Sequence, residues 1–221
     1  MSVILRGSRW PGSRVPYVIN DGSLMHDRWF EEVNAAMGYR FLLRARSGDA
    51  SRLVLTVGAM SRSEVIGWSG RASQAIGGTD KQSVVHELLH ALGFKHEQLH
   101  RHFPWDDEDP VVQKPDRMFR FYGHINTERN KLLHSRICGK LGTFYGDNNL
   151  ISRVIEVRDI GNEHRGPCDL DSVMMYSSFR DAVISAGCNN LPDVTSSGMS
   201  PHCDVLSNDD VDTLRYMYPP P

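Results

Sequence analysis

The chain lacks several features that would each point to a particular class of protein. No run approaches the roughly 18 apolar residues that a membrane-spanning helix needs, and no internal repeat is present. The formal net charge is -2 at pH 7, so the basic excess typical of nucleic-acid-binding domains is missing. We therefore expect neither a membrane span nor a nucleic-acid partner.

Cysteine is scarce and confined to the second half of the chain, at Cys138, Cys168, Cys188 and Cys203. None of these has the C-x-x-C spacing of a zinc knuckle or a redox pair. Their even number permits two disulfides, which would fit a secreted or extracellular protein. Cys188 with Cys203 is the favoured pair because it would close a loop rich in Gly, Asn, Pro and Ser. Four reduced cysteines in a cytoplasmic protein is the alternative.

The N-terminal segment "MSVILRGSRWPG" has no long apolar stretch before a small-residue cleavage site. We therefore expect any export signal to be absent or already removed. With 221 residues, 40% of them hydrophobic and 24% charged, the chain has an ordinary globular composition and is long enough to bury a core. We expect one domain over residues 1–221.

The first half combines helix and strand patterns. A helix is predicted from Ser23 to about Met37, with its apolar face at Trp29, Val33, Ala36 and Met37 and its stop at Gly38. Strands are predicted at residues 15–20, 39–46 and 52–60, and the Gly/Ser-rich residues 66–78 could add an edge strand. In residues 39–46, apolar side chains alternate and predict one buried face.

A second helix is predicted from Thr79 or Asp80 to Gly93. Beyond it the composition changes: residues 103–115 are acidic and proline-rich, a short helix is plausible at 116–122, and most of the remainder reads as loop. Ser207 and Asp210 have the spacing of a capping box, which predicts a terminal helix to about Tyr218. These patterns predict an α+β fold with an N-terminal lobe at about 1–93 and a C-terminal lobe at about 94–221.

Five of the ten histidines fall within "HELLHALGFKHEQLHRHF". His86 and His90 are four apart on the predicted helix, so both imidazoles project from one face and can reach one ion. Gly93 ends the helix in a left-handed turn that brings back His96 as a third ligand. Three protein ligands leave a position for water, as in a catalytic rather than a structural zinc site. Glu87, turned about 100° around the helix, is placed as a base beside the metal.

The other histidines fit no ligand spacing and are expected on the solvated surface: His100, His102, His124, His134, His164 and His202. Without the motif, His86, His90 and His96 would be read in the same way, as ordinary surface or core side chains.

The segment "HELLHALGFKHE" resembles the zinc-binding sequence of the astacin family of metzincin metallopeptidases, in which Phe follows the glycine and Glu follows the third histidine. Downstream, "DLDSVMMYSSF" resembles that family's Met-turn, Ser-x-Met-x-Tyr. Weaker similarities lie at "RWPGSRVPYVI", "GWSGRASQAI" and "LSNDDVDTLRYMY", whereas residues 103–167 match poorly. The resemblance implies a two-lobed metzincin fold with a twisted mixed sheet and two long helices in the N-terminal lobe.

The resemblance also implies roles for residues. His86, His90 and His96 would bind one Zn²⁺ per chain, and Glu87 would take a proton from the attacking water and pass it to the leaving amine. Met174 would form an apolar floor beneath the imidazoles. Tyr176 would be an additional zinc ligand that swings off to stabilise the oxyanion.

Further residues carry weaker implications. Glu97 would lie close to a buried mature N-terminus left by a removed prosegment; otherwise it is a surface glutamate. Substrate in extended form would pair with the edge strand containing Trp68, Ser69, Gly70 and Arg71. Arg180 is a candidate for binding acidic side chains of the substrate, and is otherwise solvated surface.

Three departures from the family limit the transfer. Met175 stands where histidine is common, "QLHRHFPWDDED" replaces the usual run after the zinc sequence, and no cysteine precedes Cys138. The family's disulfides therefore cannot be transferred, and no aspartate-bearing prosegment motif is visible.

The favoured function is a monomeric zinc endopeptidase acting on extended proteins or peptides. The main alternative is a catalytically silent zinc-containing domain that binds a peptide or protein, against which the presence of Glu87 argues. A structural metal in an unrelated protein and another metzincin branch are the remaining readings.

Overall fold

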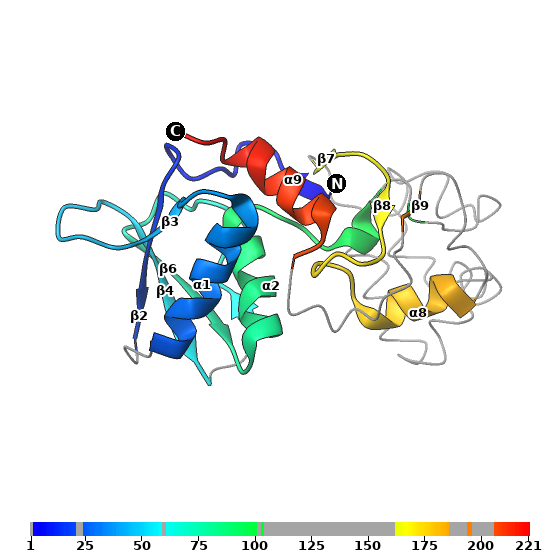
Figure 1. Cartoon of the computed structure of the whole chain (residues 1–221), viewed down its shortest axis with the longest axis horizontal. Helices are drawn as coiled ribbons and strands as arrows, with labels where there is room; N and C mark the ends of the chain where they lie inside the picture. Colours follow the sequence, from blue (N-terminus) through cyan, green and yellow to red (C-terminus); the bar gives the residue numbers. More distant parts are fainter. Residues whose placement is uncertain are drawn as a thin grey trace, which may run out of the picture.

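The computed structural model of the chain describes residues 2–20, 24–58, 61–100, 103, 162–185, 194–195 and 206–221. These residues form a mixed α+β fold in which two helices lie against one face of a five-stranded sheet (Figure 1). The predictions for residues 104–161, for His102 and His202, and for the Cys188 and Cys203 pair lie outside the described residues.

The sheet has the order β3-β2-β4-β6-β5. Its strands are β2 (Val15–Ile19), β3 (Leu42–Arg44), β4 (Arg52–Val57), β5 (Arg62–Ser63) and β6 (Ser73–Gly78). The pairings β2 with β3, β2 with β4 and β4 with β6 are parallel, and β5 runs antiparallel to β6. The strands expected near residues 15–20 and 52–60 are confirmed.

The expected edge strand within residues 66–78 is wrong in its position. Strand β6 occupies only Ser73–Gly78 and is covered on both sides, by β4 and β5. The edge is β5, which the sequence did not reveal because a two-residue strand has no measurable alternation. Residues 67–72 form bends rather than a strand.

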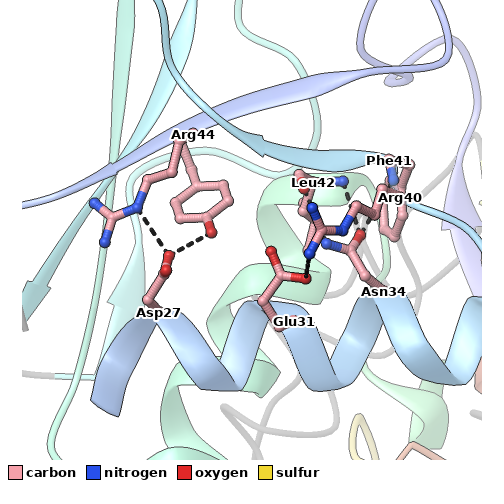
Figure 2. A network of polar contacts seen from close by, with 8 residues as sticks. Asp27, Glu31, Asn34, Arg40, Phe41, Leu42 and Arg44 are labelled. Carbon is pink, nitrogen blue, oxygen red and sulfur yellow. Dashed lines mark hydrogen bonds and ion pairs between the residues drawn. The ribbon is translucent and has the colours of Figure 1, made fainter. Parts of the chain in front are cut away.

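The alternation predicted for residues 39–46 is confirmed except at Leu42: Tyr39, Phe41, Leu43 and Ala45 are buried or half-buried, whereas Arg40, Arg44 and Arg46 are exposed. Phe41 and Leu42 are consecutive and both fully buried. Asn34 explains this arrangement, because its side-chain oxygen accepts hydrogen bonds from the backbone N–H groups of Phe41 and Leu42, at 3.1 and 3.0 Å (Figure 2). A side chain on the neighbouring helix thereby satisfies backbone N–H groups at the start of strand β3, which still pairs with β2 through Val15 and Leu42.

Helix α1 (Leu24–Met37) ends where predicted, at Gly38, which has a φ of 81°. The buried face includes Phe30 as well as Val33 and Met37, whereas Trp29 and Ala36 only pack against the core from its margin. Asp27 anchors the helix to the sheet by accepting hydrogen bonds from the Tyr17 hydroxyl (2.5 Å) and Arg44 Nε (2.8 Å) (Figure 2).

The second half contributes shorter elements. They are η1 (Glu97–Leu99), β7 (Asn162–His164), β8 (Cys168–Asp169), α8 (Ser177–Ser185), β9 (Val194–Thr195) and α9 (Asn208–Met217). The terminal helix is confirmed together with its capping box, in which Ser207 and Asp210 bind each other's backbone N–H groups. Helix α8 was not predicted.

One apolar core joins the two halves of the chain. Phe30, Leu53 and Leu88 belong to the same buried cluster as Met174 and Leu214. Strand β1 (Val3–Leu5) adds a second link, because it pairs antiparallel with β7. Within the described ranges, no helix combines the length and the apolar character that crossing a bilayer requires.

Candidate metal centre

Helix α2 (Lys81–Leu92) carries the first part of the histidine cluster. Asp80 begins it through a capping box: its carboxylate accepts from Ser83 N at 2.9 Å, and the Ser83 hydroxyl lies 3.1 Å from Asp80 N. Leu88 and Leu89 of this helix are fully buried. The predicted helix and both of its ends are confirmed.

The last carbonyl groups of α2, which have no partner within the helix, are bound by distant segments. His90 O accepts from Gly67 N at 2.8 Å, Ala91 O from Trp10 Nε1 at 2.9 Å, and Leu92 O from the Tyr218 hydroxyl at 2.9 Å. The end of the helix that carries His90 is therefore held by Gly67 and by residues near both ends of the chain, Trp10 and Tyr218.

Gly93 turns the chain back in the left-handed conformation, with φ 110° and ψ 5°. A Cβ atom there would lie 2.5 Å from Ser8 Oγ and 2.8 Å from Met217 Cε. The strand β1 then fixes the chain beyond the turn, because Leu5 N donates to Gly93 O at 2.9 Å and Lys95 N to Val3 O at 2.9 Å. Glycine is required here by both conformation and space.

The structure brings His86, His90 and His96 together. One ring nitrogen of each lies within 4.8 Å of the others, and His90 Nε2 is 3.0 Å from His96 Nε2. Two nitrogens bound to one tetrahedral zinc at about 2.0–2.1 Å would be about 3.3 Å apart. The observed spacing is close to this value, so the three imidazoles fit zinc.

The surroundings of two imidazoles also fit a metal site. His86 Nδ1 lies 2.8 Å from Val173 O, and His90 Nδ1 lies 2.9 Å from Phe94 O. In the tautomers that donate these bonds, Nε2 keeps its lone pair for a metal, as is usual for metal-binding histidines. Burial lowers the pKa of His86, and burial followed by the neighbouring His86 lowers the pKa of His90 to about 4. Both side chains are thus neutral, the form that binds metals.

Glu87 is buried beside this cluster, with 8% of its surface exposed. Burial raises its pKa to about 7, opposed by a hydrogen bond with the Ser63 backbone in the edge strand β5. A carboxyl group with a pKa near neutrality is suited to take up and release a proton.

Residues 170–176, which we call the Met174 turn, lie against the cluster from the second half of the chain. Met174 is fully buried, and its carbonyl accepts from Glu97 N at 3.0 Å. The Tyr176 ring centroid lies 4.3 Å from that of His96, and Tyr176 N donates to Gln98 Oε1 at 3.3 Å. Both residues that the resemblance singled out therefore adjoin the histidines.

Asp210 holds this turn in place from helix α9. Its carboxylate accepts hydrogen bonds from Ser172 Oγ at 2.7 Å and from Val173 N at 3.1 Å. Since Val173 also provides the acceptor for His86 Nδ1, the orientation of His86 depends on a residue 124 positions away. The sequence predicted Asp210 only as a capping residue, because nothing local signals its second set of partners.

The predicted surface exposure of His100 is wrong, and so is the alternative reading of Arg180 as a solvated side chain. His100 is 1% exposed, because η1 turns it inward and its Nε2 lies 3.1 Å from Arg165 O. Arg180 is 6% exposed and pairs with Asp171 at 3.3 Å inside the protein, so it is not a solvated side chain. The partner of His100 lies 65 residues away and that of Arg180 lies 9 residues away, and neither pairing leaves a periodic signal.

The residues expected to bind substrate are placed differently from the prediction. Trp68, Ser69, Gly70 and Arg71 lie outside every strand. Arg71 pairs with Glu64 at 2.7 Å, and Glu64 also accepts from Ala75 N at 3.1 Å. Trp68 retains 39% exposure. Glu97 is fully buried, and its expected closeness to the N-terminus stays a prediction because Met1 is not described.

Comparisons with known proteins identify a shared fold. No protein-family model matches the chain, and no curated protein sequence matches it significantly. Among solved structures, myroilysin covers 100% of both chains with a TM-score of 0.51 and 21% sequence identity. High choriolytic enzyme 1, a hatching enzyme zinc-protease from Oryzias latipes (Medaka fish), covers 96% of this chain and 94% of that chain, with a TM-score of 0.49 and 18% identity. The likeness to myroilysin supports the mixed α+β fold of the described residues.

Proposed function

We propose that this chain is a zinc-dependent endopeptidase of the astacin type that hydrolyses extended proteins or peptides. The observation that carries the proposal is the convergence of three imidazoles with a buried glutamate of raised pKa. A purely structural metal site would give such a glutamate no role.

The three imidazoles would hold one Zn²⁺ per chain. Zinc bound there would act as a Lewis acid toward a water molecule and the substrate carbonyl. The carbonyl groups of Val173 and Phe94 fix the rings of His86 and His90 through Nδ1. Met174, which is fully buried, would form an apolar floor beneath the rings and keep their geometry without competing for the ion.

Glu87 would accept a proton from the attacking water at its carboxylate and deliver it to the nitrogen of the leaving amine. Its pKa of about 7 allows both transfers near neutral pH. Tyr176, whose ring lies beside His96, would bind the metal in the resting enzyme and donate its hydroxyl proton to the developing oxyanion during the reaction.

The substrate would add to the sheet at β5. This strand pairs with β6 on one side only, so its other side can accept an extended peptide through backbone hydrogen bonds. Because Ser63 in β5 also binds Glu87, the peptide would pass directly beside the base. Trp68 is exposed nearby in sequence and remains a candidate contact.

We also infer the lobe division, the location, the processing and the oligomeric state of the enzyme from the resemblance. The division into lobes at about residues 1–93 and 94–221, secretion, removal of a prosegment and a monomeric state remain predictions. The proposed disulfide between Cys188 and Cys203 belongs with them.

Proteolysis of an unfolded protein tests the proposed function. The chain should carry zinc, cleave the substrate, lose activity with a chelator and regain it when zinc is restored. Zinc binding without cleavage under any condition would favour the alternative, a silent peptide-binding domain. A protein purified without metal and unable to take it up would contradict both.

A further inference from the structure

A second group of three metal-binding side chains is buried next to the histidine cluster. Glu97, His100 and Cys168 each offer one ligand atom, and these atoms lie within 4.8 Å of one another. The three side chains are 0%, 1% and 0% exposed. Two come from the segment of η1 and the third from β8, so the group joins parts of the chain that are far apart in sequence.

We propose that Glu97, His100 and Cys168 bind a second metal ion, with Zn²⁺ as the cation that best fits these donors. The site would be structural: it would tie the segment that follows the ligand His96 to strand β8. This goes beyond the proposed peptidase function and does not depend on it.

Glu97 provides the first argument. Its Oε1 accepts a hydrogen bond from Asp169 N at 2.9 Å, whereas Oε2 is buried and has no hydrogen-bond partner among the described residues. A buried carboxylate oxygen without a donor is unfavourable because it has lost its hydrogen bonds to water. A cation beside Oε2 would compensate for that loss.

The local charge provides the second argument. The carboxylates of Asp169 and Asp210 are 4% and 0% exposed, and both accept hydrogen bonds from Ser207, while Asp169 N donates to Glu97 Oε1 at 2.9 Å. Three carboxyl groups therefore share this interior. A bound divalent cation would offset their mutual repulsion and favour the carboxylate and the thiolate at its ligands.

The donor set decides which cation fits. One sulfur, one imidazole nitrogen and one carboxylate oxygen are ligands typical of zinc, whereas calcium and magnesium prefer oxygen alone. The Arg165 carbonyl lies 3.1 Å from His100 Nε2, which is the kind of acceptor that orients metal-bound histidines. The complete burial of all three side chains suits a structural site rather than a catalytic one.

A competing partner for Glu97 is the amino terminus, which the astacin resemblance places near it. Ser2 is fully buried, and its hydroxyl donates to Asp210 at 3.2 Å, so the start of the chain enters the same interior. An ammonium group would satisfy Glu97 without recruiting Cys168 or a metal. Counting the metals and identifying a sulfur ligand separates the two explanations.

Cobalt substitution tests the proposal on the full chain, produced in minimal medium supplemented with cobalt. Thiolate bound to Co²⁺ gives a charge-transfer absorption in the near ultraviolet, which a site made of histidines does not give. We expect two cobalt ions per chain together with this absorption. One ion per chain without the absorption would overturn the second site, and would do so without any variant.

Variants locate the ligands. Cys168→Ser should lose the absorption and one of the two ions, and His100→Gln should lose that same ion. As the matched control, Cys138→Ser/Cys188→Ser/Cys203→Ser should keep both. An absorption that persists in folded Cys168→Ser would refute the proposal.

The double variant His86→Ala/His90→Ala distinguishes this site from the catalytic one. It should keep the sulfur absorption while losing the other ion. If the wild-type chain binds two metals but does not cleave protein, the peptidase proposal is refuted and the second site stands. If it cleaves protein but binds one metal without the sulfur absorption, the second site is refuted and the peptidase proposal stands.

Discussion

The segment 80–96 and the Met174 turn contribute to the same centre in different ways. The first is a capped helix followed by a glycine turn, and it provides His86, His90, Glu87 and, beyond the turn, His96. The second has little regular structure and is held by individual polar bonds, chiefly to Asp210 and Glu97. The positions of the candidate ligands are therefore set by residues close to them in the sequence, whereas the orientation of their side chains depends on residues far away.

Removing a ligand from the helix should have the largest effect. His90→Ala leaves two imidazoles, so we expect zinc to be lost and proteolysis to fall to the level of chelator-treated enzyme. Metal analysis and a proteolysis assay measure both. His26→Gln, which changes a buried histidine of helix α1 outside the cluster, should retain zinc. Retention of zinc by His90→Ala would remove this residue from the ligand set.

Changing the glycine turn should have the next largest effect. Gly93→Ala introduces a Cβ that overlaps Ser8 and Met217 in addition to the strained φ, so we expect a loss of about 2–4 kcal/mol in the free energy of unfolding, together with weaker zinc binding. Gly38→Ala has a positive φ but no atom within 4 Å of the added Cβ, and should lose only about 1–2 kcal/mol. Equal losses in urea unfolding would show that the close contacts at Gly93 do not matter.

Loosening the Met174 turn from the other region should be milder. Asp210→Asn weakens the acceptor for Ser172 Oγ and Val173 N, and we expect zinc affinity to fall about 10-fold or more with all three histidines intact. Competition with a chelator measures this affinity. Asp212→Asn, an exposed change on the same helix, should leave it unaltered. Unchanged affinity in Asp210→Asn would mean that the turn does not orient His86.

The cap at the start of helix α2 should have the smallest effect. Asp80→Ala should lower the free energy of unfolding by about 1 kcal/mol near neutral pH. The hydrogen bond from Ser83 lowers the pKa of Asp80 below 3.8, so the stability supplied by its charge is present above that value and is lost as pH falls through the lower, folded-state pKa. Urea unfolding at several pH values should show the difference between wild type and Asp80→Ala shrinking below about pH 4. Asp80→Asn, which keeps the cap without the charge, should show no such titration; a pH-independent gap for Asp80→Ala would contradict the assignment.

The sequence predicted the features that depend on neighbouring residues and missed those that depend on other contacts. Helix α2, its stop at Gly93 and the grouping of His86, His90 and His96 were predictable because spacing and capping act within a few residues. The burial of His100 and the second role of Asp210 were not, because each depends on a partner far away in the sequence. The burial of Arg180 and the edge strand β5 involve nearer partners, but neither leaves a periodic pattern in the sequence. Leu42 departs from the alternation at a point where Asn34, from the preceding helix, binds the backbone of Phe41 and Leu42.

The most direct test of the central claim is a paired measurement on Glu87→Gln, in which zinc content and the rate of proteolysis are compared with those of the wild-type chain. Because Glu87 adjoins the histidines without belonging to their group, we expect zinc at the wild-type level and a rate at least about 100-fold lower. A variant that binds zinc and cleaves at the wild-type rate would contradict the assignment of Glu87 as the base.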